Sequence, residues 1–428
     1  MRITIHRGTD QIGGCVTEYE HDGWRLFVDY GEQLPGSQKT GPLEIEELTK
    51  GDLSKSALLI THYHGDHIGC IKDLPDGLSI YMGEVGRNIQ LALSEHLVYV
   101  DNFQKDMIEK LKDIKTFLAG RAFPIGPFII MPITVDHSAF DAYAFKIEAN
   151  KVSVFHTGDF RTHGFRSGKL KEVIEKYVGK VDYMVSEATN VNRAPTAVEK
   201  ESALQQRFED SLNDRGGHIV YVSSTNIDRI FSLYHAALKA KVPFFVDAYQ
   251  KKIMDVVTEG DTLWGKSSLY QYEEYPPIVL QRDKTDFKVN DHFLETLGKR
   301  GYVLLARPND RFNTLIEKIP GKKTKYLSMW KGYVDPNNEA CNKVLAKALE
   351  SGYEYLHTSG HCDMESLSDV ISMLKPKTII PIHTDNPDEF VRRFKEELPV
   401  IRLHDDEKCD LDAKGQVSEV HNGTDPSV

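Results

Sequence analysis

The sequence lacks the features of a membrane-spanning or secreted protein. Over its 428 residues, no apolar run reaches the length needed to cross a bilayer. Residues 1–7 contain no apolar signal-peptide core and resemble an opening strand instead. Internal repeats and low-complexity linkers are absent as well. We therefore expect a cytoplasmic protein that has no membrane partner.

Cysteine is scarce and poorly spaced for cross-linking. The chain has an odd number of widely spaced cysteines and no C-x-x-C pair: Cys15, Cys70, Cys341, Cys362 and Cys409. This pattern argues against a disulfide framework and against a structural zinc ribbon. Reduced thiols in a cytosolic protein are the simpler interpretation.

An excess of positive charge is also lacking. The formal net charge is -11, from 53 Lys and Arg residues against 64 Asp and Glu residues. Such a chain does not coat nucleic acid by charge alone. A nuclease is still allowed, because bound metal ions supply local positive charge and a few basic side chains can line a groove.

The length predicts two domains, or one domain with a large insertion. In the first part, short apolar runs alternate with turns and predict strands over residues 3–5, 15–19, 25–28, 57–60, 128–131, 142–147, 152–155 and 181–185. Between them, residues 84–118 have apolar positions at helical spacing and predict one or two helices.

The pattern changes after about residue 195. Helical stretches over residues 197–213, 226–240 and 338–350 alternate with apolar runs over 218–222, 243–246 and 302–305. This alternation predicts a parallel sheet flanked by helices, which we assign to a second α/β domain over 195–355. The chain then returns to a helix over 364–374 and a strand over 378–382. The polar residues 411–428 are expected to form a mobile tail.

Ionisable residues follow the predicted strands of the first part and of the return segment. They are Asp29, His62, His137, His156, Asp159, Glu187 and His383. Binding residues commonly sit at strand ends, where a rigid sheet holds them. If these ends point the same way, they build a dense cluster of carboxylates and imidazoles, and such a cluster suits zinc.

The segment His62-x-His64-x-Asp66-His67 carries the sharpest signal. Two histidines two residues apart on an extended turn can both reach one ion, and the Asp-His pair just beyond can face a second ion. A single histidine in this position would more often be a solvated loop residue. The whole pattern predicts two divalent metal ions, zinc by preference and manganese as the alternative.

This segment, placed after a strand, resembles the metallo-β-lactamase superfamily. Asp29, His137 and Asp159 follow in the order expected there. Three further segments resemble the additional motifs of the β-CASP nucleases, which include ribonuclease J and the endonuclease of mRNA 3′-end cleavage: Ser186-Glu187-Ala188-Thr189-Asn190, Thr358-Ser359-Gly360-His361 and Pro381-Ile382-His383-Thr384. The resemblance covers nearly the whole chain, although the sequence ends before the further C-terminal domain of the ribonuclease J family.

The resemblance implies an α/β fold, an αββα metallo-β-lactamase sandwich with an inserted parallel α/β β-CASP-like domain. The sandwich would comprise residues 1–194 and 356–410, and the insertion residues 195–355. It also implies roles for the site residues. One metal would be held by His62, His64 and His137, and the other by Asp66, His67 and His383, with Asp159 as the bridge. Asp29 would accept a hydrogen bond from a ligand histidine.

Glu187 and His361 are implied to act beside the metals. Glu187 would orient His361, and His361 would contact the scissile phosphate or protonate the leaving oxygen. The alternatives are a surface carboxylate at a strand end and a histidine at a helix start. Thr225 and Ser359 are candidate contacts for a substrate phosphate. For Thr225, the equally weighted alternative is an N-cap of the helix over 226–240.

The expected function is therefore a two-metal phosphodiesterase, a ribonuclease that cuts single-stranded RNA through a metal-bound hydroxide, with Asp66, His361 and Glu187 as its catalytic residues. DNA remains an alternative substrate, and a homodimer is allowed. The competing hypothesis is a hydrolase of a small phosphodiester, lactone or thioester.

Residues 246–250 and 306–310 do not match the glycine-rich stretches of ribonuclease J, which leaves the substrate and 5′-exonuclease action open. Cys362 is interpreted as a small packing residue.

Overall fold

The protein is described by a computed structural model over residues 1–37, 41–193, 198–260, 267–283 and 286–421. The chain divides into two compact units. Unit 1 comprises Met1–Thr162, Arg166–Ala197 and Gly360–Val428, and unit 2 comprises His163–Phe165 and Val198–Ser359. The boundary predicted at 194/195 lies outside the described residues. The extent 195–355 of an inserted domain stays a prediction.

Unit 1 contains two sheets. The first has the order β20-β19-β1-β2-β3-β4-β5-β6 and the second the order β18-β11-β10-β9-β8-β7. The first sheet consists of β1 (Arg2–Arg7), β2 (Val16–His21), β3 (Trp24–Val28), β4 (Ser56–Leu59), β5 (Ser79–Gly83), β6 (Lys115–Phe117), β19 (Lys408–Leu411) and β20 (Val417–His421). The second consists of β7 (Phe123–Ile125), β8 (Phe128–Val135), β9 (Ala142–Ala149), β10 (Val152–His156), β11 (Tyr183–Glu187) and β18 (Thr378–Ile382).

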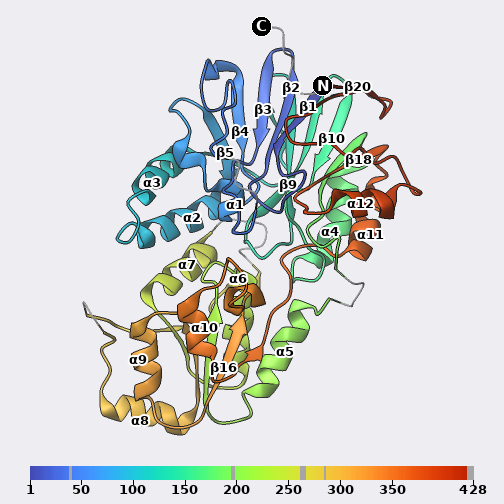
Figure 1. Ribbon diagram of the computed structural model, residues 1–428. Helices are drawn as coiled ribbons and strands as arrows, with labels where there is room; N and C mark the ends of the chain where they lie inside the picture. Colours follow the sequence, from blue (N-terminus) through green and yellow to red (C-terminus); the bar gives the residue numbers. More distant parts are fainter. Residues whose placement is uncertain (38–40, 194–197, 261–266, 284–285, 422–428) are drawn as a thin grey trace. The chain divides into compact units, whose positions relative to one another are not determined.

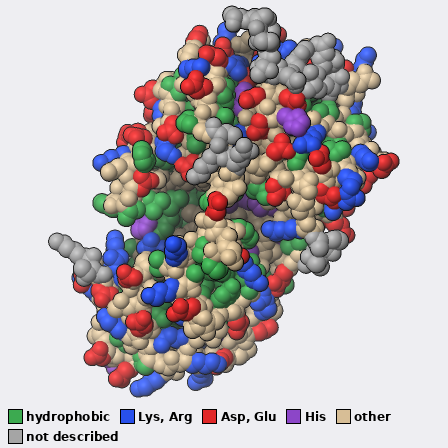
Figure 2. Space-filling view, in the orientation of Figure 1, with side chains coloured by type: hydrophobic (Ala, Val, Ile, Leu, Met, Phe, Trp, Pro, Cys, Tyr) green, Lys and Arg blue, Asp and Glu red, His purple; other side chains and the backbone are tan. Residues whose placement is uncertain are grey.

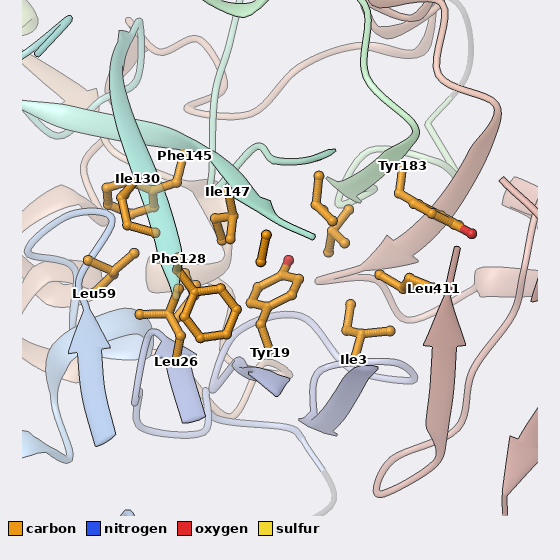
Figure 3. Packing of buried hydrophobic residues seen from close by; sticks show 14 of the residues in the cluster. Ile3, Tyr19, Leu26, Leu59, Phe128, Ile130, Phe145, Ile147, Tyr183 and Leu411 are labelled. Atoms are coloured by element: carbon orange, nitrogen blue, oxygen red, sulfur yellow. The ribbon is translucent and has the colours of Figure 1, made fainter. Parts of the chain in front are cut away.

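The two sheets of unit 1 face each other across an apolar core. Figure 3 shows Ile3, Tyr19 and Leu26 of the first sheet opposite Phe128 and Ile147 of the second. The core forms because side chains alternate between the two faces of each strand, so that every second residue of a strand points into the sandwich.

Helices cover the outer faces of this sandwich. The opposite face of β8 and β9 supplies Ile133 and Ala144 to a second apolar cluster, which includes Leu367 and Ile371 of α11. Figure 1 shows α2 and α3 beside β4 and β5, and α11 and α12 beside β18, so unit 1 has αββα layers. Its helices are α1 (Gly65–Ile68), α2 (Glu84–Leu97), α3 (Gln104–Asp113), α4 (Leu170–Val173), α11 (Met364–Leu374) and α12 (Pro387–Phe394).

Unit 2 is built on a sheet of order β14-β13-β15-β12-β16-β17, in which all five strand pairings are parallel. Its strands are β12 (Gly217–Val222), β13 (Phe244–Val246), β14 (Ile278–Val279), β15 (Tyr302–Ala306), β16 (Lys323–Ser328) and β17 (Glu354–Tyr355). Its helices are α5 (Glu201–Ser211), α6 (Ile227–Lys239), α7 (Ala248–Glu259), α8 (Asp291–Arg300), α9 (Asp310–Lys318) and α10 (Lys343–Leu349). The predicted alternation of helices and parallel strands is confirmed here.

Two predictions at the edges of unit 1 are wrong. The helical pattern over 84–118 ends at Asp113, and residues 115–117 form β6, because they pair in parallel with β5. The expected mobile tail over 411–428 contains β20, because Gly415 at a positive φ of 78° turns the chain back and residues 417–421 pair with β19. The rest of that tail, 422–428, lies outside the described residues.

The surface is polar and mixed in charge. In the view of Figure 2, Asp and Glu side chains alternate with Lys and Arg side chains across both units. Within the described ranges, no helix is both long enough and apolar enough to span a bilayer.

The core of unit 1 predicts a measurable contrast between two neighbouring residues of β8. Phe128 is completely buried between the sheets, whereas Ile129 is 44% exposed on the other face of the strand. Phe128→Ala should lower the free energy of unfolding by about 3–5 kcal/mol, because it removes a buried ring and leaves a cavity. Ile129→Ala should change it by only about 0.5 kcal/mol. Urea unfolding followed by circular dichroism measures both, and equal losses would contradict the assigned register.

Candidate metal centre

The candidate site lies where strands of both sheets of unit 1 end. In the second sheet, β8, β10, β11 and β18 run in one direction, since β9 is antiparallel to both β8 and β10 while β11 pairs in parallel with β10 and β18. Their carboxyl ends therefore meet at one edge, and they carry His137, Asp159, Glu187 and His383. The parallel strands β3 and β4 of the first sheet end at Asp29 and the His62 segment.

The backbone bends sharply at two of these ends. Asp29 has a φ of 61° and His383 a φ of 53°, a conformation that residues other than glycine adopt rarely and that concentrates at functional sites. Gly31 allows the loop after β3 to approach the Asp66 backbone, because a Cβ at this position would lie 1.7 Å from the Asp66 carbonyl oxygen. Local backbone geometry thus places Asp66 and His67, both on α1, beside the strand ends.

Among the described residues, four groups of candidate ligands have atoms within 4.8 Å of one another. Two of them overlap the others, namely His62-His67-Asp159 and Asp159-Glu187-His361-His383, and the remaining two are the predicted ligand sets. Of these two, one group is His62, His64 and His137, and the other is Asp66, His67 and His383. In the first group, Nε2 of His137 lies 3.2 Å from Nδ1 of His64. In the second, Nε2 of His383 lies 3.4 Å from Oδ2 of Asp66.

Asp159 touches both groups through one oxygen. Its Oδ2 lies 3.1 Å from Nε2 of His67, 3.7 Å from Nε2 of His383 and 3.9 Å from Nε2 of His62. A carboxylate in this position has the geometry needed to bridge two cations. The seven predicted ligands are therefore all present in one cluster.

The ring nitrogens that face away from the cluster are held by hydrogen bonds. His67 donates from Nδ1 to Oδ2 of Asp29 at 2.7 Å, and His137 donates from Nδ1 to the Gly360 carbonyl at 2.6 Å. Nδ1 of His383 lies 2.7 Å from the hydroxyl of Thr189. These partners fix the ring orientation and leave Nε2 of each histidine free to act as a ligand.

The donor set fits a divalent cation. Nε2 of His62 and Oδ1 of Asp159 are buried and have no hydrogen-bond partner in the described part of the chain. Buried polar atoms are normally paired, so two unpaired atoms in one cluster indicate a missing partner. Burial, reinforced by neighbouring histidines, holds the pKa of His62 well below its usual value, and burial likewise lowers the pKa of His64 to about 4. Both rings are therefore neutral near pH 7, as zinc requires.

The second ligand group attracts positive charge. Burial disfavours the imidazolium form of His67, but the carboxylates of Asp159, Asp29 and Asp66 outweigh it and raise its pKa well above the usual value. Burial also opposes ionisation of Asp66, yet His67 and His383 hold its pKa at about 2. A bound cation would satisfy the same carboxylates and displace the proton from His67.

Glu187 and His361 form a pair beside the cluster. Oε2 of Glu187 lies 3.2 Å from Nδ1 of His361, while Oε1 accepts hydrogen bonds from the backbone N–H groups of Phe160 and Cys362. Burial disfavours a charged His361, but Glu187 and Asp159 outweigh it and raise its pKa to about 9. The ring is therefore a proton donor at neutral pH.

The remaining sequence candidates lie elsewhere. Cys362 is buried in the apolar cluster of α11, and burial raises its thiol pKa well above the usual value, as suits a packing residue. Thr225 and Ser359 belong to unit 2. The side chain of Asn226 caps α6 by accepting from Arg229 N–H, so the N-cap alternative for Thr225 is wrong. The Ser359 carbonyl accepts a hydrogen bond from Nε2 of His163.

Sequence reasoning missed three groups that orient the ligands. Thr61 lies between Asp29 and His62: its hydroxyl donates to Oδ2 of Asp29 at 2.8 Å and lies 3.0 Å from Nδ1 of His62. Thr189 and the Gly360 carbonyl were likewise unassigned. Thr189 follows Glu187 by two residues at a strand end, a spacing that could have indicated its role, whereas no sequence signal marks a backbone carbonyl.

The sequence of this chain is similar to a known protein family and to several known proteins. Residues 350–402 match the family model described as "Zn-dependent metallo-hydrolase RNA specificity domain". Ribonuclease J of Helicobacter pylori is 22% identical over 412 residues, covering 90% of this chain and 56% of that protein. Ribonuclease J of Mycobacterium tuberculosis is 23% identical over 414 residues, covering 90% of this chain and 68% of that protein. The chain thus spans little more than half the length of the Helicobacter relative.

A solved structure shares the fold. The crystal structure of a protein of unknown function from Enterococcus faecalis V583 superposes with a TM-score of 0.73 at 18% sequence identity, and the match covers 95% of this chain and 99% of that one. The fold and the donor set define a metal-binding protein with the metallo-β-lactamase fold, as predicted. Within that fold, the chain is similar to ribonuclease J proteins over most of its length, and residues 350–402 resemble the RNA specificity domain of zinc-dependent metallo-hydrolases.

Proposed function

We propose that this protein is a metal-dependent phosphodiesterase that cuts single-stranded RNA. Two divalent ions, zinc by preference, would be held by His62, His64, His137, Asp66, His67, Asp159 and His383. The proposal draws on the ribonuclease J relatives and on the RNA specificity model that matches residues 350–402. Residues 195–355 are proposed to be the β-CASP-like insertion.

The observation that carries the proposal is the pair formed by Glu187 and His361. A metal cluster alone requires neither residue, yet Nδ1 of His361 lies 3.2 Å from Glu187 and 3.6 Å from Oδ2 of Asp159. A protonated imidazole beside a two-cation cluster is suited to the departure of an alkoxide, which is the difficult part of cleaving a phosphodiester. This favours a substrate with an alkoxide leaving group over a thioester, and the ribonuclease J relatives and the RNA specificity model favour an RNA backbone among such substrates.

The metal ions and the residues around them have separate roles in the proposed reaction. The metal ions, when bound, supply a water of lowered pKa as the nucleophile and positive charge for the phosphoryl oxygens. Asp29, Thr189 and the Gly360 carbonyl keep the ligand rings in place through their hydrogen bonds. Glu187 holds His361 in its charged form, and His361 donates its proton from Nε2 to the leaving oxygen. The electron pair of the broken P–O bond stays on that oxygen.

One experiment separates this function from its competitors. The purified protein, loaded with zinc or manganese, is incubated with end-labelled single-stranded RNA, single-stranded DNA and a chromogenic phosphodiester, alongside Asp66→Ala and His361→Ala. We expect the wild type to cleave RNA, Asp66→Ala not to cleave it, and His361→Ala to cleave it about 10²–10⁴-fold more slowly. If only the small ester is hydrolysed and His361→Ala is as active as the wild type, the nuclease proposal is wrong. Preferential cleavage of DNA would overturn the choice of RNA.

A further inference from the structure

A buried charged cluster lies directly behind the ligand His137. It consists of Asp136, Arg161 and Arg166, with side chains that are between 0 and 2% exposed. Nε of Arg161 donates to Oδ1 of Asp136 at 3.0 Å, and the Ser167 N–H donates to Oδ2 at 2.9 Å. Nη2 of Arg166 lies 3.9 Å from Oδ1 of the same carboxylate. Asp136 therefore connects three segments of unit 1.

This cluster joins the segments that carry two of the metal-ligand candidates. Asp136 follows β8 and directly precedes His137, while Arg161 follows Asp159 by two residues in the loop after β10. A backbone bridge reinforces the side-chain contact, since the Arg161 N–H donates to the Asp136 carbonyl at 2.7 Å. The side chain and the main chain thus fix the spacing between the loop of His137 and the loop of Asp159.

Arg166 holds the His137 segment from another side. Its Nη2 donates to the carbonyl of His137 at 2.5 Å and to that of Ala139 at 3.2 Å, and its guanidinium lies 5.1 Å from the centre of the Phe140 ring. These contacts restrain the main chain of His137, whereas the Gly360 carbonyl restrains its ring. His137 therefore has little freedom to rotate away from His64.

We propose that Asp136, Arg161 and Arg166 are positioning residues that set His137 in register with Asp159 for metal binding, an inference that rests on the proposed metal-dependent function. A buried ion pair adds little net stability over an apolar packing of similar volume. Its value here is geometric, because metal affinity depends on ligand atoms held at fixed separations by groups beyond the ligands themselves.

Metal binding to the apo-protein tests this inference without using RNA cleavage. Zinc affinity is measured by competition with a chromophoric chelator, and the coordination geometry by the visible absorption spectrum of the cobalt(II)-substituted protein. We expect Arg161→Met and Asp136→Asn to weaken the binding of zinc about 10–100-fold and to change the cobalt spectrum. Arg161→Lys keeps the charge and should recover part of the affinity.

Arg25→Met is the matched control. Arg25 donates to both oxygens of Glu18 at 2.6 Å, in the same unit, and neither residue belongs to the ligand groups. The Arg25→Met substitution should leave zinc affinity and the cobalt spectrum unchanged even if it lowers the unfolding temperature. If Arg161→Met does not fold, Arg161→Lys and Asp136→Asn carry the comparison.

The possible outcomes separate the inference from the function on which it rests. If folded Arg161 and Asp136 variants lose thermal stability but bind zinc as the wild type does, the cluster is merely structural and the inference is overturned. If the wild type itself binds no zinc, both the inference and the proposed function are wrong. Weaker zinc binding in the Arg161 variants together with normal binding in Arg25→Met supports the positioning role.

Discussion

Asp159→Ala should empty the metal centre and abolish RNA cleavage. Oδ2 of the Asp159 carboxylate lies 3.1 Å from Nε2 of His67 in one ligand group and 3.9 Å from Nε2 of His62 in the other. The substitution would take away the carboxylate that both bound cations are proposed to share. Zinc affinity should fall by more than about 100-fold, because a direct ligand contributes more than the surrounding groups, whose loss costs about 10–100-fold.

Elemental analysis after dialysis and a chelator competition measure this loss, and thermal unfolding adds an independent check. At free zinc 100 times above its Kd, the wild type should gain about 2.7 kcal/mol of stability per zinc site over the apo-protein, whereas Asp159→Ala should gain almost none. Asp182→Ala is the control, since Asp182 of unit 1 pairs with Lys377 and Ser153 outside the ligand groups. Retention of two zinc ions by Asp159→Ala would show that this carboxylate does not bridge them.

The cluster could be foreseen from sequence because each of its members follows a local pattern. His62, His137 and His383 each come just after a short apolar run, and such runs predict strands without knowledge of their partners. Parallel strand direction then brings the ends together, which the structure shows for β8, β10, β11 and β18. The two facing sheets therefore bring His62 and His383, which are 321 positions apart, into one cluster.

What could not be foreseen depends on contacts between distant segments. The Gly360 carbonyl holds His137 across 223 residues, and a backbone oxygen leaves no trace in residue type. The strand β6 has only three residues and exists because β5 offers it a free edge, so no local apolar pattern precedes it. The helix α7 was missed although Asp247 and Gln250 form a capping box at its start, a signal that was available in the sequence.

His361→Ala should leave the metal centre intact and still remove most of the activity. His361 is not among the seven predicted ligands, so zinc content should stay at the wild-type level. Loss of a positioned proton donor lowers the rate by about 10²–10⁴-fold. Single-turnover cleavage of labelled RNA, with zinc measured on the same sample, tests this prediction. His404→Ala is a surface control, since that side chain is 57% exposed.

Glu187→Gln tests whether the neighbouring carboxylate sets the protonation of His361. In the metal-free protein, Glu187 and Asp159 raise the pKa of His361 to about 9 against the effect of burial. Because Glu187 is not among the seven predicted ligands, its carboxylate should still favour the protonated ring when metal is bound, and that proton is lost as the pH rises through the pKa. Glutamine keeps the shape but not the charge, and the pKa of His361 should fall. The alkaline limb of the pH–rate profile should therefore move to lower pH while the acid limb stays in place. An unchanged alkaline limb in Glu187→Gln, with normal zinc content, would mean that His361 does not donate the proton and that its part in cleavage is limited to contact with the phosphate.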